Sequence, residues 1–130
     1  MGNSQSSVDV LLADDDEQIV AILQFMLERQ GYSVVVARDG NQVRDYVSAN
    51  FPPGLVMLDV MMPYVDGFEL VDFIRQAEGW HDVPLVLLTG KNKEEDIVSA
   101  LKKGVNDYIN KPFQPAEVVA RVAMLMKKHG

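Results

Sequence analysis

An apolar run, Val8-Asp9-Val10-Leu11-Leu12-Ala13, stops at three consecutive acids, Asp14-Asp15-Asp16. A short apolar run that ends at polar residues is typical of a buried β-strand. The pattern recurs where Leu55-Val56-Met57-Leu58 ends at Asp59, and again where a later run ends at Thr89. Each of these runs predicts a buried strand that finishes at a polar side chain.

Between these runs the hydrophobic residues take the period of a helix. Ile19, Ile22 or Leu23, and Met26 predict one buried helical face, and Gly31 ends that helix. Five strand–helix units in succession predict an α/β fold, a five-stranded parallel sheet with helices on both faces. Right-handed crossovers favour the doubly wound, flavodoxin-like strand order 2-1-3-4-5. The remaining elements are predicted as strands at 32–37, 84–88 and 108–109 and as helices at 41–50, 68–76, 93–103 (apolar face Ile97, Val98 and Leu101) and 115–128.

Composition limits the class of protein. The chain has 130 residues with 19 Asp or Glu against 12 Lys or Arg, a formal net charge of −7. This length suits one domain, which we expect at residues 8–130 after a disordered polar tail at residues 1–7. No apolar run approaches the roughly 18–20 residues of a membrane span, and the absence of cysteine excludes thiolate chemistry.

The charge is unevenly distributed along the chain. Residues 1–90 carry 4 Lys or Arg and 14 Asp or Glu, a net charge of −10, whereas residues 91–130 carry 8 and 5, a net charge of +3. The overall acidity argues against direct binding of nucleic acid. It leaves open why carboxylates gather in the first part of the chain.

The carboxyl ends of parallel strands meet at one edge of a sheet, where such folds bind their ligands. This rule brings together Asp14, Asp15, Asp16, Asp59, Thr89 and Lys111. Taken singly, each has an ordinary explanation as a helix cap, a loop hydroxyl or a solvated charge. Together, the carboxylates would repel one another unless a cation neutralises them, and Mg²⁺ prefers such oxygen ligands. A carboxylate placed there can attack a phosphoryl group, with the lysine and the hydroxyl as further contacts.

The chain has neither a G-x-x-x-x-G-K-[ST] loop nor a G-x-G-x-x-G motif that would favour nucleotide binding. Four other motifs occur in order along it: Val10-Leu11-Leu12-Ala13-Asp14-Asp15-Asp16, Leu58-Asp59-Val60-Met61-Met62-Pro63 with Asp66-Gly67, Leu87-Leu88-Thr89-Gly90, and Asp107-Tyr108-Ile109-Asn110-Lys111-Pro112-Phe113. Together they resemble the motifs of the receiver domain of two-component response regulators, and the resemblance covers about residues 8–128.

The resemblance implies a role for each matching residue. Asp59 would be the phosphoacceptor, with Thr89 and Lys111 in contact with the phosphoryl group. Mg²⁺ would be bound by Asp59, by the acidic pair Asp14 and Asp15, and by the backbone carbonyl of Met61. Because the side chain of Met61 is apolar and cannot orient an attacking water, we expect slow autodephosphorylation.

The family also implies a switch and a readout surface. Tyr108 would be the aromatic residue that turns inward when Thr89 moves, and the Lys111–Pro112 peptide would be cis. Residues 93–128 would form a surface that changes on phosphorylation and through which a homodimer could form. Lys102, Lys103, Asp107 and Arg121 are candidates for ion pairs across such a dimer, with a solvated face as the alternative.

The resemblance further implies partners and a location. The phosphoryl donor would be a sensor histidine kinase or a phosphotransfer protein in the cytoplasm. The chain would serve as a signalling phosphoacceptor and not as an enzyme that acts on a separate substrate. Its output domain or target protein is not defined by the sequence.

Two other functions stay open at this stage. A phosphatase of the haloacid dehalogenase type also uses an aspartate nucleophile, in a D-x-D arrangement after the first strand that Asp14 and Asp16 would match. The chain is short for that fold, which would also leave the motif around Asp59 unexplained. A receiver-like module that binds partners without phosphorylation is the second alternative, although such modules usually lose an acid or the lysine.

Overall fold

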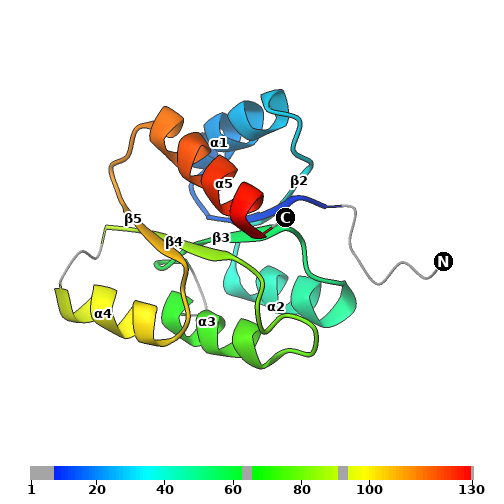
Figure 1. Ribbon diagram of the computed structural model, residues 1–130, viewed down its shortest axis with the longest axis vertical. Helices are drawn as coiled ribbons and strands as arrows, with labels where there is room; N and C mark the ends of the chain where they lie inside the picture. Colours follow the sequence, from blue (N-terminus) through cyan, green and yellow to red (C-terminus); the bar gives the residue numbers. More distant parts are fainter. Residues whose placement is uncertain (1–7, 63–65, 91–93, 130) are drawn as a thin grey trace.

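The computed structural model describes residues 8–62, 66–90 and 94–129, so the tail predicted at residues 1–7 lies outside the described residues. Strands and helices alternate along the whole described chain (Figure 1). Their bounds are β1 (Val10–Ala13), α1 (Glu17–Arg29), β2 (Val34–Ala37), α2 (Gly40–Ala49), β3 (Leu55–Asp59), α3 (Gly67–Gln76), β4 (Leu85–Thr89), α4 (Glu94–Lys102), β5 (Asp107–Asn110) and α5 (Pro115–His129).

The five strands form one parallel sheet in the order β2-β1-β3-β4-β5, which confirms the predicted topology. The register pairs Ala13 of β1 with Leu58 of β3, so Asp14 and Asp59 follow at the same level of the sheet. Thr89, the last residue of β4, pairs with Asn110, the last residue of β5. All the polar strand ends therefore lie at one edge.

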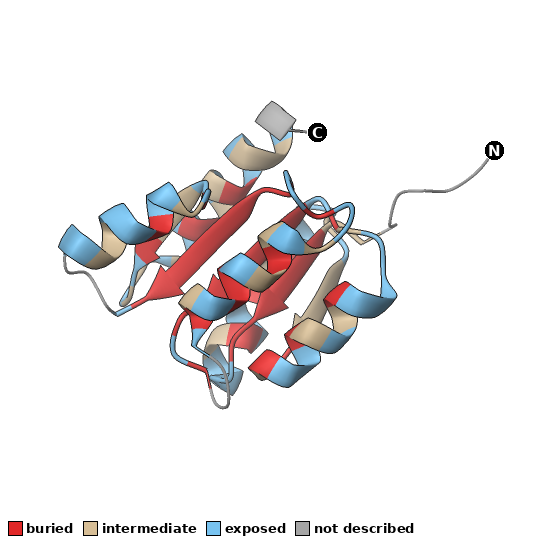
Figure 2. Cartoon of the chain, turned by 90° about the horizontal axis from the view of Figure 1, so that it is seen from below, coloured by how far each residue is buried: buried red, intermediate tan, exposed pale blue. Residues whose placement is uncertain are grey.

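Two helical layers cover the sheet, with α1 and α5 on one face and α2, α3 and α4 on the other (Figure 1). Successive strand residues point to opposite faces, so Leu11 and Leu58 pack toward α2 and α3 whereas Leu12 and Met57 pack toward α1 and α5. Burial colouring shows the strands as the most buried part of the molecule (Figure 2). Each face thus has its own hydrophobic core, with the sheet between them.

Three aspartates fix where helices begin. The carboxylates of Asp16, Asp39 and Asp66 accept hydrogen bonds from the backbone N–H groups in the first turns of α1, α2 and α3, which are otherwise without partners within a helix. Gly31, at φ +95°, follows the end of α1 in a left-handed conformation that favours glycine. Capping residues thus define the beginnings of α1, α2 and α3.

Two helical faces differ from the sequence prediction. The core face of α1 consists of Val20, Leu23 and Leu27, whereas Ile22 is 44% exposed. Leu23 was predicted on this face, and Ile19 packs against the core while partly exposed. The centre of the face nevertheless lies about one residue later than predicted, because α1 carries apolar residues on several sides. In α4, Ala100 is the buried residue among those described, and the predicted apolar face has Val98 42% and Leu101 52% exposed.

At the edge opposite the polar strand ends, Arg75 of α3 joins several loops. Its guanidinium donates hydrogen bonds to the carbonyls of Trp80 (3.3 Å), Val83 (2.8 Å) and Gly104 (2.7 Å) and to Asn106 Oδ1 (3.3 Å). Burial lowers the pKa of Arg75, and the nearby charge of Asp82 opposes this shift.

In the described part of the chain, no helix is long and apolar enough to cross a membrane.

We predict that Arg75→Lys lowers the free energy of unfolding by about 1–3 kcal/mol. The single ammonium of lysine cannot donate all the hydrogen bonds that the planar guanidinium makes to four acceptors. Urea denaturation measures this change. Arg38→Lys is the control, since Arg38 makes an exposed 3.6 Å pair with Glu17 and the substitution is expected to cost less than about 0.5 kcal/mol. Equal effects of the two substitutions would contradict the prediction.

Candidate functional site

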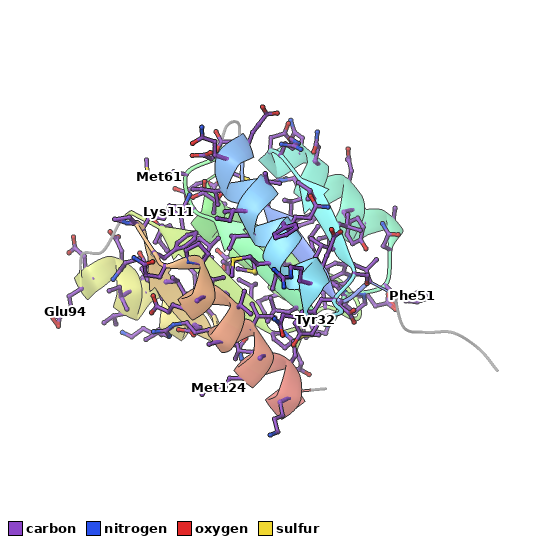
Figure 3. All side chains as sticks on the ribbon, turned by 90° about the horizontal axis from the view of Figure 1, so that it is seen from above. Tyr32, Phe51, Met61, Glu94, Lys111 and Met124 are labelled. Carbon is purple, nitrogen blue, oxygen red and sulfur yellow. The ribbon has the colours of Figure 1, made fainter. Side chains whose placement is uncertain are left out.

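Three side chains from three strand ends meet at the edge of the sheet. The ammonium of Lys111, just after β5, lies 3.0 Å from Asp14 Oδ2 and 3.5 Å from Asp59 Oδ2. Asp14 is fully buried and Asp59 is 4% exposed, whereas the Lys111 side chain remains 22% exposed. In the side-chain view, Lys111 and Met61 lie at this edge, far from Tyr32 and Phe51 (Figure 3). The structure thus brings together residues that the strand ends predicted.

Backbone N–H groups hold the two buried carboxylates in place. Asp14 Oδ1 accepts a hydrogen bond from the N–H of Asp16 at 2.9 Å, and Asp59 Oδ1 accepts one from the N–H of Met61 at 3.1 Å. In each case the donor lies two residues further along the chain. One oxygen of each carboxylate is therefore bound by backbone, and the other faces Lys111.

Asp15 completes a cluster that can hold a metal ion. One carboxylate oxygen from each of Asp14, Asp15 and Asp59 lies within 4.8 Å of the others. Asp15 is exposed, so the cluster opens to solvent on its side. A set of carboxylate oxygens at a solvent-accessible edge suits a hard divalent cation that keeps some of its waters. The donor set therefore fits the metal that the sequence predicted.

The site raises the pKa of Asp59 from 3.8 to about 6. Burial is the largest cause, and the negative charge of Asp14 is the second; the Met61 N–H and the charge of Lys111 act in the opposite direction. Without a further cation, the ionised form of Asp59 is therefore disfavoured. A cation bound beside these carboxylates would favour the ionised form of Asp59.

Thr89 and Tyr108 lie next to this cluster. Thr89 is fully buried, and its carbonyl accepts a hydrogen bond from the N–H of Lys111 at 2.8 Å. Burial raises the pKa of Tyr108, and the charge of Asp96 adds to this, while a side-chain hydrogen bond with Thr89 opposes it. The Lys111–Pro112 peptide is cis, as predicted. The lysine, the threonine and the tyrosine thus form one connected group.

The structure separates Asp16 from the cluster. Its carboxylate caps α1 by accepting hydrogen bonds from Gln18 N (2.9 Å) and Ile19 N (3.2 Å). The D-x-D arrangement expected of a haloacid dehalogenase therefore lacks its second acid at the site. The backbone donors of Asp16 and Met61 were missed by sequence reasoning, because side-chain identity carries no signal for main-chain hydrogen bonds.

Comparisons with known proteins agree with this geometry. The sequence model described as "Response regulator receiver domain" matches residues 10–123. The chain is 41% identical over 119 residues to the alkaline phosphatase synthesis transcriptional regulatory protein PhoP of Bacillus subtilis, covering 92% of this chain and 48% of that protein. It is 37% identical over 119 residues to the transcriptional regulatory protein CpxR of Escherichia coli, covering 92% and 49%.

A solved structure extends the likeness to three dimensions. The receiver domain of the Francisella response regulator 1452 superposes with a TM-score of 0.86 at 32% identity, covering 95% of this chain and 99% of that one. The chain belongs to the family of response regulator receiver domains, which act by phosphoryl transfer in two-component signalling. It spans about half the length of the curated relatives that it matches.

We predict that Asp59→Asn stabilises the metal-free protein at neutral pH by about 1–2 kcal/mol, because it removes a buried charge beside Asp14. The pKa of Asp59 is raised on folding, so its ionised form lowers the free energy of unfolding fully above about pH 6 and not at all below about pH 3.8. The difference in free energy of unfolding between the variant and the wild type should therefore decrease as the pH falls from 6 toward 4. Urea denaturation in the presence of a chelator measures this difference.

The control for this prediction is Asp45→Asn, at an exposed position on α2. This substitution removes the same charge from the chain without changing the cluster. We expect it to change the free energy of unfolding by less than about 0.5 kcal/mol at either pH 4 or pH 7.5. A gain in Asp59→Asn that is equal at pH 4 and pH 7.5 would show that repulsion within the cluster is not its cause.

Proposed function

We propose that Asp59 of this receiver domain accepts a phosphoryl group. The observation that carries the proposal is the buried pair Asp14 and Asp59 with Lys111 between them, at 3.0 and 3.5 Å. This arrangement presents a carboxylate nucleophile next to a fixed positive charge, as transfer of an anionic group requires. Family membership supports the same assignment.

The transfer step involves one bond made and one bond broken. An oxygen of Asp59 attacks the phosphorus atom of a phosphorylated imidazole, and a P–O bond forms as the P–N bond breaks. The electron pair of the P–N bond stays on the imidazole nitrogen, which takes up a proton. Lys111 attracts the oxygens of the incoming group, and the hydroxyl of Thr89 donates a hydrogen bond to one of them.

Asp14, Asp15 and Asp59 would hold a divalent ion, which we propose to be Mg²⁺, with the Met61 carbonyl as a further ligand. The fit is supported by the all-oxygen donor set and by the open side at Asp15. When bound, Mg²⁺ neutralises charge on the carboxylates and on the transferred group. The residues of the chain orient Asp59 and the phosphoryl oxygens around it.

The proposed donor is a sensor histidine kinase or a phosphotransfer protein in the cytoplasm, in keeping with the family. A pocket of about 360 Å³ beside the site, lined by Ile19, Lys111, Pro112 and Phe113, offers such a donor a mainly apolar contact. In this proposal the chain acts on no separate substrate. Its response passes instead to an output domain or a target protein.

We propose the readout surface, and a phosphorylation-dependent homodimer, at residues 93–128. Within the described part of that range, Arg121 pairs with Asp107 at 3.0 Å, and Lys103 pairs with Asp72 at 2.7 Å. Both cations therefore have partners within the chain. The exposed apolar residues Val98 and Leu101 of α4 are the stronger candidates for contact with a second copy.

We predict that acetyl phosphate with Mg²⁺ adds one phosphoryl group to the wild-type chain and none to Asp59→Asn, because the amide is not a nucleophile. Intact-mass spectrometry detects the product. Asp16→Asn is the matched control: Asp16 lies outside the cluster, and an asparagine caps a helix equally well. This variant should be phosphorylated as fully as the wild type.

Other outcomes would identify other functions. Full labelling of Asp59→Asn would refute the assignment of the phosphoacceptor. Turnover of a generic phosphate ester that is lost in Asp14→Asn but kept in Asp59→Asn would indicate a phosphatase. No labelling, together with no Mg²⁺-dependent response to beryllofluoride, would indicate a module that works without phosphorylation.

We predict that the phosphorylated chain is long-lived and that Met61→Asn shortens its half-life at least about threefold. The Met61 side chain is 61% exposed beside Asp59 and apolar, whereas an amide there can orient an attacking water. The half-life is measured as loss of the phosphoryl mass in Mg²⁺ buffer. Met61→Leu, which is also apolar, should leave it unchanged, and a half-life that is insensitive to Met61→Asn would contradict the prediction.

A further inference from the structure

The start of α3 lies directly against the chain that leaves β3. The N–H of Gly67, the first residue of α3, donates a hydrogen bond to the carbonyl of Val60 at 2.9 Å, and Asp66 pairs with Met61 in an isolated antiparallel bridge. On its other side, Val60 donates its N–H to the carbonyl of Leu88 in β4 at 3.1 Å. Val60 is therefore held between β4 and the beginning of α3.

One peptide unit connects Gly67 to the carboxylate of Asp59. The carbonyl of Val60 and the N–H of Met61 belong to the same planar group, so the direction of one fixes the direction of the other. The carbonyl accepts from Gly67, and the N–H donates to Asp59 Oδ1 at 3.1 Å. The hydrogen bond from Gly67 therefore sets the direction of the donor that holds Asp59.

No side chain fits at position 67. A Cβ there would lie 2.5 Å from the Cα of Val60, 3.0 Å from its carbonyl oxygen and 3.1 Å from its carbonyl carbon. These are backbone atoms, and the hydrogen bond to Leu88 restrains Val60 from moving away. Glycine is required by this close approach, because any larger residue would displace the peptide that binds Asp59.

We propose that Gly67 is a positioning residue for phosphorylation: its lack of a Cβ lets α3 orient the Val60–Met61 peptide, which in turn orients the carboxylate of Asp59. The inference rests on the proposed function of Asp59. With Oδ1 bound to Met61, Oδ2 is directed toward Lys111. Without that hydrogen bond, the carboxylate rotates and loses its alignment with the incoming phosphoryl group.

The test is Gly67→Ala, compared with Val71→Ala, a fully buried position in the same helix whose side chain packs in the core. Urea denaturation first shows that both variants are folded and how far each is destabilised. We expect Gly67→Ala to lower the rate of phosphorylation by acetyl phosphate about tenfold or more, as small misplacements of a reacting group do. Val71→Ala should keep the rate within about twofold of the wild type.

A spectroscopic signature separates positioning from stability. In Gly67→Ala, the Met61 amide proton should move upfield and exchange faster with solvent, because it loses its carboxylate acceptor; in Val71→Ala it should not. In the wild type itself, the amides of Gly67 and Met61 should both be protected from exchange. This exchange measurement on the wild type tests the hydrogen bonds of the Gly67 and Met61 amides even if Gly67→Ala does not fold.

Three results would overturn the proposal. The first is a Met61 amide proton whose chemical shift and exchange rate are unchanged in Gly67→Ala. The second is a phosphorylation rate that falls as much in Val71→Ala as in Gly67→Ala. The third is a wild-type Gly67 amide proton that exchanges as fast as an exposed one. If the wild-type chain accepts no phosphoryl group at all, the proposed function is wrong. The amide measurements then decide alone whether Gly67 orients Asp59.

Discussion

The ammonium of Lys111 lies between two carboxylates that the sheet has removed from solvent, and the geometry of the site depends on this contact. Asp14 and Asp59 come from neighbouring strands and are buried at the same level. Two anions in such a place repel each other, and loss of Lys111, which faces both of them, would cost about 3–5 kcal/mol. Lys111 follows Asp14 by 97 positions in sequence, so the contact forms only when β1, β3, β4 and β5 lie side by side.

The uneven charge of the chain acquires a structural meaning from this contact. The acidic first part holds the cluster, and the basic last part supplies Lys111, which reaches back to neutralise it. Of the other basic residues described in the last part, Arg121 pairs with Asp107 and Glu117, and Lys103 pairs with Asp72. Part of the positive charge of residues 91–130 is therefore neutralised within the chain.

The order of elements and the members of the site could be predicted because they depend on local signals. Apolar runs that end at polar residues gave the strands, and the geometry of a parallel sheet then placed Asp14, Asp59, Thr89 and Lys111 together. The outward face of α4 could not be predicted, because a hydrophobic period says that one face is apolar but not that a partner within the chain covers it. The contact between Gly67 and Val60 was also beyond the sequence, since it joins main-chain atoms.

The sheet itself has a mechanical consequence. Strands β1, β3 and β4 are buried along their whole length by helices on both faces (Figure 2), and so densely packed a layer transmits strain instead of absorbing it. A phosphoryl group on Asp59, as proposed, would therefore lie beside a densely packed layer that deforms little. Among the described helices, α4 buries the least, with Ala100 as its buried residue. We therefore expect strain from the proposed phosphorylation of Asp59 to be relieved by movement of α4 and not within the sheet.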